Sequence, residues 1–137
     1  MALSHLADTS VLARLDKADV RSVVQRLMAN SSLGRCTISD LEIGNSARNA
    51  DEWDTLLRAV RTFVTVDIDP TDVTRASGVQ RALAAEGRRG RKVPDLLIAA
   101  AAERRGLRLL HYDRDFEHIA HVTGQPHEWV VPRGTID

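Results

Sequence analysis

The pattern most able to do chemistry in this sequence is a set of four carboxylic acids that are far apart along the chain: Asp8, Glu42, Asp95 and Asp113. Two carboxylates about 5 Å apart repel each other by roughly 3 kcal/mol at an effective dielectric constant of 20. A fold that gathers four of them needs a counter-charge, and oxygen ligands suit a hard divalent cation, Mg²⁺ or Mn²⁺. Because magnesium held by carboxylates commonly acts on phosphates, the set predicts phosphoryl chemistry.

Each of these acids also has a purely structural explanation. Ser39 and Glu42 have the S-x-x-E spacing of a capping box. Asp95 falls in the first turn of a helix, where the positive end of the helix dipole stabilises an anion. The other two acids can bond to residues that closely follow them, Asp8 to Ser10 and Asp113 to the helix that begins near Asp115. Local caps explain each acid alone, but they do not predict that all four share one edge of the fold.

The segment that most strongly fixes the position of one acid is residues 93–102, with the sequence Val-Pro-Asp-Leu-Leu-Ile-Ala-Ala-Ala-Ala. Leu and Ala favour a helix, and Pro94 suits its first turn. A helix that is apolar on every side has to be buried. We therefore expect it to pack against a sheet with Asp95 at its mouth, and Gly106 is placed to end it.

Strands alternate with helices along the chain. We expect strands at residues 3–7, 35–38, 63–69, 107–112 and 128–131, which are short apolar runs. Between them apolar residues recur at helical spacing, as in a long helix from Pro70 with an inner stripe of Val73, Ala76, Val79 and Leu83. This alternation predicts an α/β fold, with one domain over residues 1–137 and a central parallel sheet of about five strands covered by helices on both faces.

The carboxyl ends of parallel strands are the edge at which such sheets bind ligands. Asp8 and Asp113 directly follow two of the predicted strands. Glu42 lies in the first turn of the helix after the 35–38 strand, and Asp95 opens a helix on the same edge. The sequence thus predicts that the four acids meet in one pocket.

The overall composition excludes several classes of protein. The chain has 137 residues, of which 43% are hydrophobic and 28% charged, as in a globular domain. A single cysteine, Cys36, excludes an internal disulfide and a multi-cysteine zinc site. We expect no signal peptide, no membrane span and a cytoplasmic location. Because basic and acidic residues number 19 each, net charge does not indicate a partner.

A basic loop directly precedes Asp95 and is the best candidate for contact with a phosphate backbone. Its basic residues are Arg88, Arg89, Arg91 and Lys92. A solvated loop without a ligand would explain the same residues. Arg114, which stands between two acids, either joins this RNA-binding set or only screens its neighbours.

Four stretches resemble the PIN-domain toxins of the VapC type, in order and over essentially the whole chain: Asp8-Thr9-Ser10, Glu42, residues 94–100 and residues 111–116. The resemblance implies a Mg²⁺- or Mn²⁺-dependent endoribonuclease that cleaves structured RNA, either transfer RNA or ribosomal RNA. It also implies inhibition by a small VapB-type antitoxin and assembly into a homodimer or a toxin–antitoxin hetero-oligomer. Many relatives have Asn where Pro94 stands, so one possible side-chain contact is missing here.

The resemblance carries the family's acidic site over to this chain, with Asp115 and Ser10 in support of Asp8, Glu42, Asp95 and Asp113. Our hypothesis is that Asp8, Asp95 and Asp113 hold the metal directly or through water. Glu42 then ligates the metal or orients the nucleophilic water. Attack of this water on a phosphodiester would leave 5′-phosphate and 3′-hydroxyl ends, as the resemblance implies.

Two alternatives from other functional classes stay open. A receiver-like phosphoacceptor domain needs a lysine at the end of a late strand, and the only lysines, Lys17 and Lys92, end no clear strand. A PIN-like module that binds without catalysis would keep the fold and lose the chemistry. The presence of all four acids speaks against this second alternative.

Overall fold

The structure is a computed structural model that describes residues 2–88 and 91–137. Its strands are β1 (Leu3–Ala7), β2 (Ser32–Cys36), β3 (Val64–Val66), β4 (Arg108–His111) and β5 (His127–Trp129). Its helices are α1 (Thr9–Leu12), α2 (Ala18–Asn30), α3 (Thr37–Gly44), α4 (Ala50–Val60), α5 (Pro70–Ala85), α6 (Val93–Arg104) and α7 (Asp115–Thr123).

The five strands form one parallel sheet in the order β3-β2-β1-β4-β5. The predicted α/β class and central parallel sheet are therefore confirmed. Because β1 is the central strand and pairs with both β2 and β4, the segments that follow these three strands are neighbours at the carboxyl edge.

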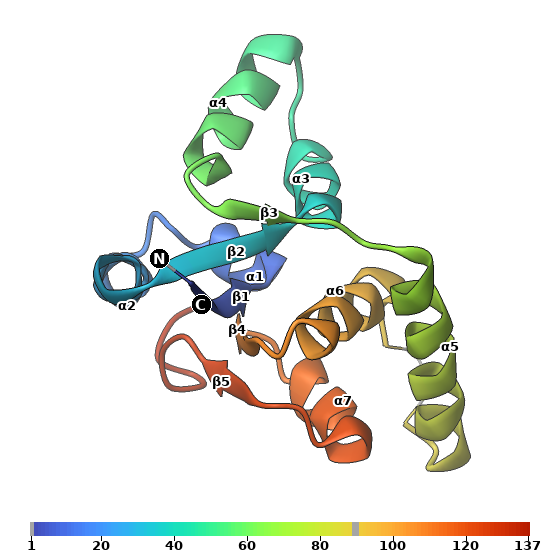
Figure 1. Cartoon of the computed structure of the whole chain (residues 1–137). Coiled ribbons are helices and arrows are strands. Elements are labelled where there is room, and N and C mark those ends of the chain that lie inside the picture. Colours follow the sequence, from blue (N-terminus) through green and yellow to red (C-terminus); the bar gives the residue numbers. More distant parts are fainter. Residues whose placement is uncertain (1, 89–90) are drawn as a thin grey trace.

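Helices cover both faces of the sheet, and alternation along the strands explains why. In β1, Leu6 belongs to the core on the side of α5, α6 and α7, while Ala7 belongs to the core on the side of α2. Leu109 and Leu110 of β4 divide in the same way. Figure 1 shows α2 on one side of the strands and α5, α6 and α7 on the other, whereas α3 and α4 extend away from the sheet.

Helix α6, which carries Asp95, is the most deeply buried helix in the described part of the chain. Pro94 lies in its first turn, and residues 98–102 are all buried. The chain leaves α6 at Gly106, whose φ of 66° lies in the left-handed region that glycine adopts without strain. This agrees with the expectation that Gly106 ends the helix. Because the C-terminal end of α6 leads into the start of β4, the N-terminal turn of α6, with Asp95, lies at the carboxyl edge of the sheet.

Ala76, Val79 and Leu83 of α5 are buried as predicted, but the structure corrects the fourth position of that inner stripe, Val73. Val73 is 54% exposed, whereas its neighbour Asp72 is buried. The Asp72 carboxylate accepts hydrogen bonds from Arg104 of α6 at 2.8 and 2.9 Å and from the Asp69 amide at 3.0 Å. These hydrogen bonds compensate the burial of the Asp72 carboxylate. Asp72 can therefore face inward, while Val73 points outward.

Several strand boundaries also differ from the prediction. Strand β2 spans Ser32–Cys36 instead of residues 35–38, and because it ends at Cys36, α3 begins at Thr37. Strand β3 is limited to Val64–Val66, and Val64 is 45% exposed because β3 lies at the edge of the sheet. Strand β5 ends at Trp129, although Val130 and Val131 after it stay buried.

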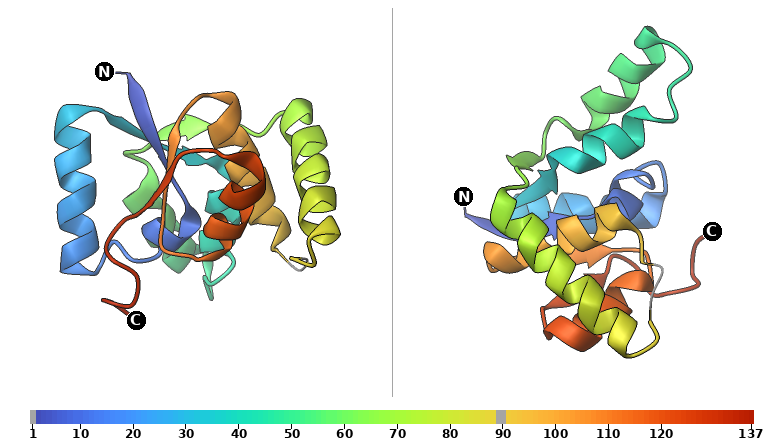
Figure 2. Two further views of the ribbon diagram at one scale, coloured as in Figure 1. Left: turned by 90° about the horizontal axis from the view of Figure 1, so that it is seen from below. Right: turned by 90° about the vertical axis from the view of Figure 1, so that its right-hand side faces the viewer.

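Figure 2 shows the same layers from two further directions, with α3 and α4 projecting as a pair beyond the sheet. Within residues 2–88 and 91–137, none of the helices combines the length and the apolar character that a membrane crossing requires.

Candidate active site

The four acids singled out in the sequence line one pocket of about 210 Å³. The pocket lies at the carboxyl ends of β1 and β4, where the chain continues into α1 and into the turn before α7. Its other lining residues are Thr9, Ser10, Ala13, Arg14, Lys92 and Tyr112. Segments that are far apart in the sequence thus supply the acids of a single small pocket.

The pairing of β1 with β4 brings two of these acids together. Ala7 is aligned with Leu110, and the Asp8 amide donates to the Leu110 carbonyl at 2.9 Å, which extends the ladder by one bond. The Ser10 hydroxyl then accepts a hydrogen bond from the Tyr112 amide at 2.9 Å. Ser10 therefore fastens the start of α1 to the end of β4, next to Asp113.

Asp8 caps α1 and is almost fully buried. Its Oδ2 accepts the Ser10 amide at 2.9 Å, so the local turn expected from the sequence is present. Its Oδ1 is buried and has no hydrogen-bond donor among the described residues. Burial raises the pKa of Asp8 to about 6, although hydrogen bonds from Ser10 oppose the shift, and the negative charge of Glu42 adds to it.

Asp95 lies in the first turn of α6 but does not cap this helix. The N-cap residue is Lys92, without a side-chain cap bond, and Oδ2 of Asp95 is buried with no donor in the described part of the chain. Burial, followed by the charges of Asp8 and Asp113, raises the pKa of Asp95 to about 8. The cap explanation is therefore wrong for this acid, which faces other acids instead.

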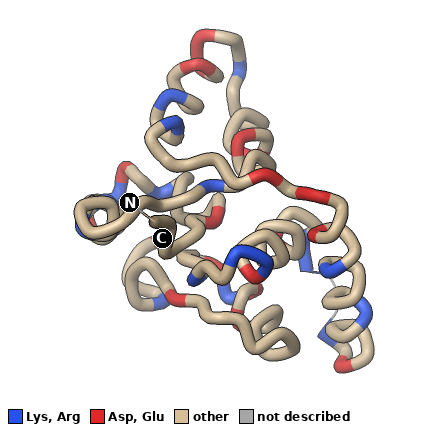
Figure 3. Tube along the Cα trace, viewed as in Figure 1, with Lys and Arg blue, Asp and Glu red and all other residues tan. Residues whose placement is uncertain are grey.

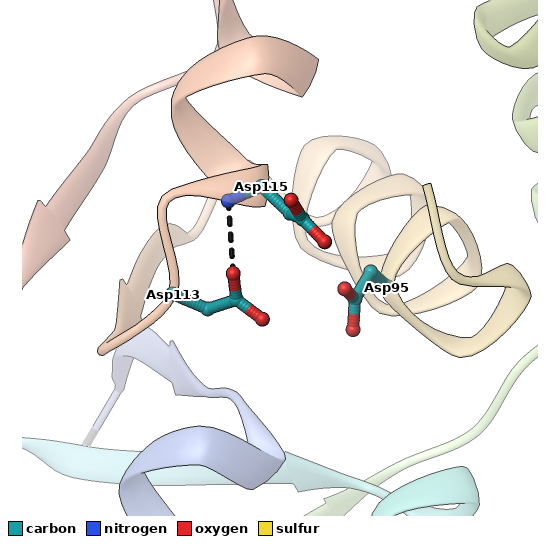
Figure 4. Close-up of side chains that lie close together, drawn as sticks. All are labelled: Asp95, Asp113 and Asp115. Carbon is teal, nitrogen blue, oxygen red and sulfur yellow. Dashed lines mark hydrogen bonds between the residues drawn. The ribbon is translucent and has the colours of Figure 1, made fainter. Parts of the chain in front are cut away.

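Asp113 and Asp115 approach Asp95 closely, as Figure 4 shows. One carboxylate oxygen from each of the three lies within 4.8 Å of the others. Asp113 Oδ1 accepts the Asp115 amide at 2.9 Å, so the predicted local bond exists alongside this grouping. Asp115 also accepts a hydrogen bond from Arg91 at 2.6 Å. Asp115, considered only a supporting acid from the sequence, thus belongs to the tightest acidic group.

Glu42 reaches the pocket from the second turn of α3, because this helix begins at Thr37. The expected capping box with Ser39 is absent, since Cys36 is the N-cap residue and makes no side-chain cap bond. Instead the Thr9 hydroxyl contacts both side chains, at 2.8 Å from Ser39 Oγ and 2.6 Å from Glu42 Oε1. Sequence reasoning missed Thr9, and its place next to Asp8 at the end of a strand was the available signal.

His111 is a second residue that the sequence analysis missed. It is fully buried at the end of β4, where Nδ1 accepts the Asp113 amide at 3.2 Å and Nε2 lies 2.9 Å from His127 Nδ1. Burial, with a smaller contribution from His127, lowers the pKa of His111 to about 3. The neutral ring is therefore an acceptor that fixes the backbone from which the Asp113 side chain projects.

The predicted RNA-binding residues are not equivalent in the structure. Lys92 lines the acidic pocket, and Arg114 is exposed at the start of α7. Arg91 is engaged with Asp115, and Arg88 lies 2.7 Å from His118 Nδ1. Arg89 lies outside the described residues. Figure 3 shows that basic and acidic residues are interspersed over the fold, so these local positions matter more than net charge.

The donors in the pocket fit a divalent cation. Asp8 and Asp95 are 2% and 4% exposed, and each has a buried carboxylate oxygen without a donor among the described residues. A buried carboxylate in this situation is costly unless a cation or a proton compensates it. Hard oxygen ligands of this kind suit Mg²⁺ or Mn²⁺.

Comparison with known proteins agrees with this arrangement. The family model of the PIN domain matches residues 6–122. Ribonuclease VapC51 of Mycobacterium tuberculosis is 53% identical over 137 residues, which cover 100% of both chains. Ribonuclease VapC21 of the same species is 43% identical, covering 98% of this chain and 99% of the relative.

A solved structure shares the fold at much lower sequence identity. The crystal structure of VapBC2 from Rickettsia felis, bound to a DNA fragment from its promoter, contains a chain that matches with a TM-score of 0.78 and 14% identity. The match covers 93% of this chain and 98% of that chain. This match shows the shared fold, whereas the family model and the full-length identities show that the chain belongs to the PIN-domain family, among its VapC-type ribonucleases.

Proposed function

We propose that this chain is a metal-dependent endoribonuclease, the toxin of a type II toxin–antitoxin pair, acting on structured RNA in the cytoplasm. The observation that carries the proposal is the pocket in which Asp8 and Asp95 each present, beside Asp113, a buried oxygen that has no hydrogen-bond partner within residues 2–88 and 91–137. The whole of residues 1–137 is taken as the PIN domain that performs this function. The receiver-like alternative is set aside because the chain is a PIN-family member.

In this proposal Asp8, Asp95 and Asp113 hold Mg²⁺ or Mn²⁺, with Asp115 in support. The bound cation supplies positive charge that polarises a phosphodiester oxygen and lowers the pKa of a water. Glu42 orients the attacking water, and the Thr9 hydroxyl keeps the Glu42 carboxylate in place. Attack of this water on the phosphorus, with the 3′ oxygen of the preceding nucleotide as the leaving group, would leave 5′-phosphate and 3′-hydroxyl ends.

Two basic residues are best placed to receive the RNA backbone. Lys92 lines the acidic pocket itself, so its ammonium group can contact the phosphate that is cut. Arg114 is exposed beside Asp113 and can contact a neighbouring phosphate. Arg88 and Arg91 are placed less directly for RNA binding, because each already contacts another side chain.

An apolar groove next to the acids supports binding of a VapB-type antitoxin. This groove of about 480 Å³ lies between α1, α3 and α4 and shares Thr9, Ala13 and Glu42 with the acidic pocket. Leu12, Leu15, Ile43 and Leu56 are among its lining residues. An antitoxin segment with apolar side chains for the groove and an arginine for the acids would inhibit the enzyme. The structural neighbour VapBC-5 from Mycobacterium tuberculosis is a member of the VapBC family of toxin–antitoxin systems, and for this chain we expect a toxin–antitoxin hetero-oligomer or a homodimer.

The test is cleavage of purified transfer RNA and ribosomal RNA by the full-length chain. We expect cleavage with Mg²⁺ or Mn²⁺, none with a chelator, and none for Asp95→Asn in either condition. Asp54→Asn is the matched control, because Asp54 is an exposed acid on α4 outside the pocket. A chain that binds RNA but leaves it intact with either metal would instead be the non-catalytic binding module.

A further inference from the structure

A second depression of about 380 Å³ adjoins the acidic pocket and has a different chemistry. The two share Arg14, Tyr112 and Asp113. The remaining residues of the second depression are Arg114, Trp129, Arg133, Gly134 and Asp137. It lies beside β5 and the C-terminal segment, which Figure 1 shows in red. Arginines and aromatic rings thus stand directly next to a cluster of acids.

The wall of this depression is held in place before any ligand binds. The Tyr112 hydroxyl accepts the amides of Gly134 at 3.1 Å and Ile136 at 3.2 Å, and it donates to the Ile136 carbonyl at 2.7 Å. Thr135 bonds back to the Pro132 carbonyl through its amide and its hydroxyl. Because Tyr112 is itself 8% exposed, the segment is anchored to the core rather than lying loosely on it.

Two of the three arginines that line the depression, Arg14 and Arg133, are oriented by contacts with other residues. Arg14 donates to the Ser10 carbonyl at 2.8 Å and to Asp137 at 3.2 Å, with its guanidinium 5.2 Å from the centre of the Tyr112 ring. The Arg133 guanidinium lies 5.9 Å from the centre of the Trp129 ring. The Arg14 guanidinium therefore lies next to the acidic pocket. The Trp129 ring and the Arg133 guanidinium form an adjoining aromatic and guanidinium surface in the depression.

Glu117 contacts both residues of this surface, Trp129 and Arg133. It accepts the Trp129 indole N–H at 3.2 Å and lies 3.6 Å from Arg133. Trp129 also contacts Tyr112 edge to face, with ring centres 5.3 Å apart. An indole fixed on several sides presents a surface for stacking at little further entropic cost.

We propose that this depression binds the nucleotide next to the phosphodiester that is cut. Its phosphate lies against Arg14 and Arg114, and its base packs against Trp129 and Arg133. A cluster of acids repels a polyanion, so cations directly beside it have to bring the backbone in. Aromatic and guanidinium planes bind a base from single-stranded nucleic acid by stacking. This inference rests on the proposed ribonuclease function and adds the place where the flanking nucleotide lies.

The experiment uses the indole signal of Trp129 in the full chain. The chain has two tryptophans, so Trp53→Phe leaves Trp129 as the only indole in an amide correlation spectrum. In the presence of a chelator, we expect adenosine 5′-monophosphate and a short oligoadenylate to shift this signal. Inorganic phosphate alone should not, because it carries no base. An equal shift with phosphate would mean an anion site only and would overturn the proposal.

Affinity for fluorescein-labelled oligoadenylate gives the second measurement. Arg133→Ala should weaken binding roughly 5- to 10-fold, since it removes a stacking surface. Arg26→Ala is the matched control, because Arg26 is exposed near the end of α2, at the opposite edge of the sheet. If Arg133→Ala and Arg26→Ala bind RNA equally well, or if no RNA shifts the Trp129 signal, the depression is not a nucleotide site.

The outcomes distinguish this inference from the proposed function. Asp95→Asn should lose cleavage and still shift Trp129 with oligoadenylate. Cleavage that persists in Asp95→Asn would contradict the acidic mechanism and leave the nucleotide site intact. Cleavage by the parent with an unresponsive Trp129 would contradict only the nucleotide site.

Discussion

Without a bound cation, the folded chain should lose stability as the pH rises, because its buried acids resist ionisation. Asp95 has an ordinary pKa of 3.8 when unfolded and about 8 when folded. Its protonated form therefore stabilises the fold fully below about pH 4, and this stabilisation is lost as the pH rises toward 8. Since one pKa unit corresponds to about 1.36 kcal/mol, complete ionisation of Asp95 costs at most about 6 kcal/mol. Asp8, with a pKa of about 6, acts in the same direction.

Asp95→Asn is the perturbation that isolates this cost. An amide has nearly the same shape as the carboxylate and stays neutral at every pH. In a chelator at about pH 8.5, we expect the variant to be more stable than the parent by on the order of 3 kcal/mol, or about 10 °C in Tm for a domain of this size. At about pH 4 the two proteins should have free energies of unfolding within about 1 kcal/mol of each other.

Thermal unfolding followed by circular dichroism measures both effects. At neutral pH, Mg²⁺ or Mn²⁺ at about 100 times its dissociation constant should add about 2.7 kcal/mol to the parent, and far less to Asp95→Asn. The control Asp54→Asn should follow the parent throughout. A parent Tm that does not change with pH in a chelator, or a variant that melts below the parent at about pH 8.5, would refute the reasoning.

Two further predictions concern contacts that the sequence did not reveal. Thr9→Val removes the hydroxyl that donates to Glu42, so the cleavage rate should fall about 10-fold or more at unchanged RNA affinity. The control variant Thr55→Val on α4 should cleave as the parent does. A loss of RNA affinity in Thr9→Val would mean instead that Thr9 contacts the substrate. Gly44→Ala places a Cβ 2.5 Å from the Trp53 indole nitrogen, so the free energy of unfolding should fall by about 1–3 kcal/mol. In a Trp129→Phe background, where Trp53 is the only tryptophan, its emission should shift to longer wavelength. An unshifted emission with parental Tm would show that α3 and α4 are not packed through this contact.

The sequence by itself determined the architecture, because the relevant signals are local. Apolar runs at strand and helix spacing predicted a parallel α/β sheet, and the structure confirms it. The buried helix at residues 93–104 followed from its run of Leu and Ala after Pro94. Topology then placed Asp8 and Asp113 together, since both follow strands that pair in the sheet.

Only the tertiary structure decided how the individual side chains are used. Glu42 bonds to Thr9 rather than to its own helix, and Arg91 bonds to Asp115. Which of several polar partners a side chain meets depends on the packing of segments far apart in the sequence, and periodicity carries no information about that.

The packing of segments far apart in the sequence also explains why Asp72 faces inward and why the second depression lies beside the acids. Asp72 is buried because Arg104 of another helix reaches it. The depression exists because Tyr112 anchors the C-terminal segment near Trp129. Local sequence patterns fix which face of an element is apolar, whereas contacts between distant elements choose the partners of its polar groups. The acids and their neighbours close in sequence, Ser10 and Asp115, could therefore be found from the sequence, but contacts with distant segments, such as that of Glu42 with Thr9, could not.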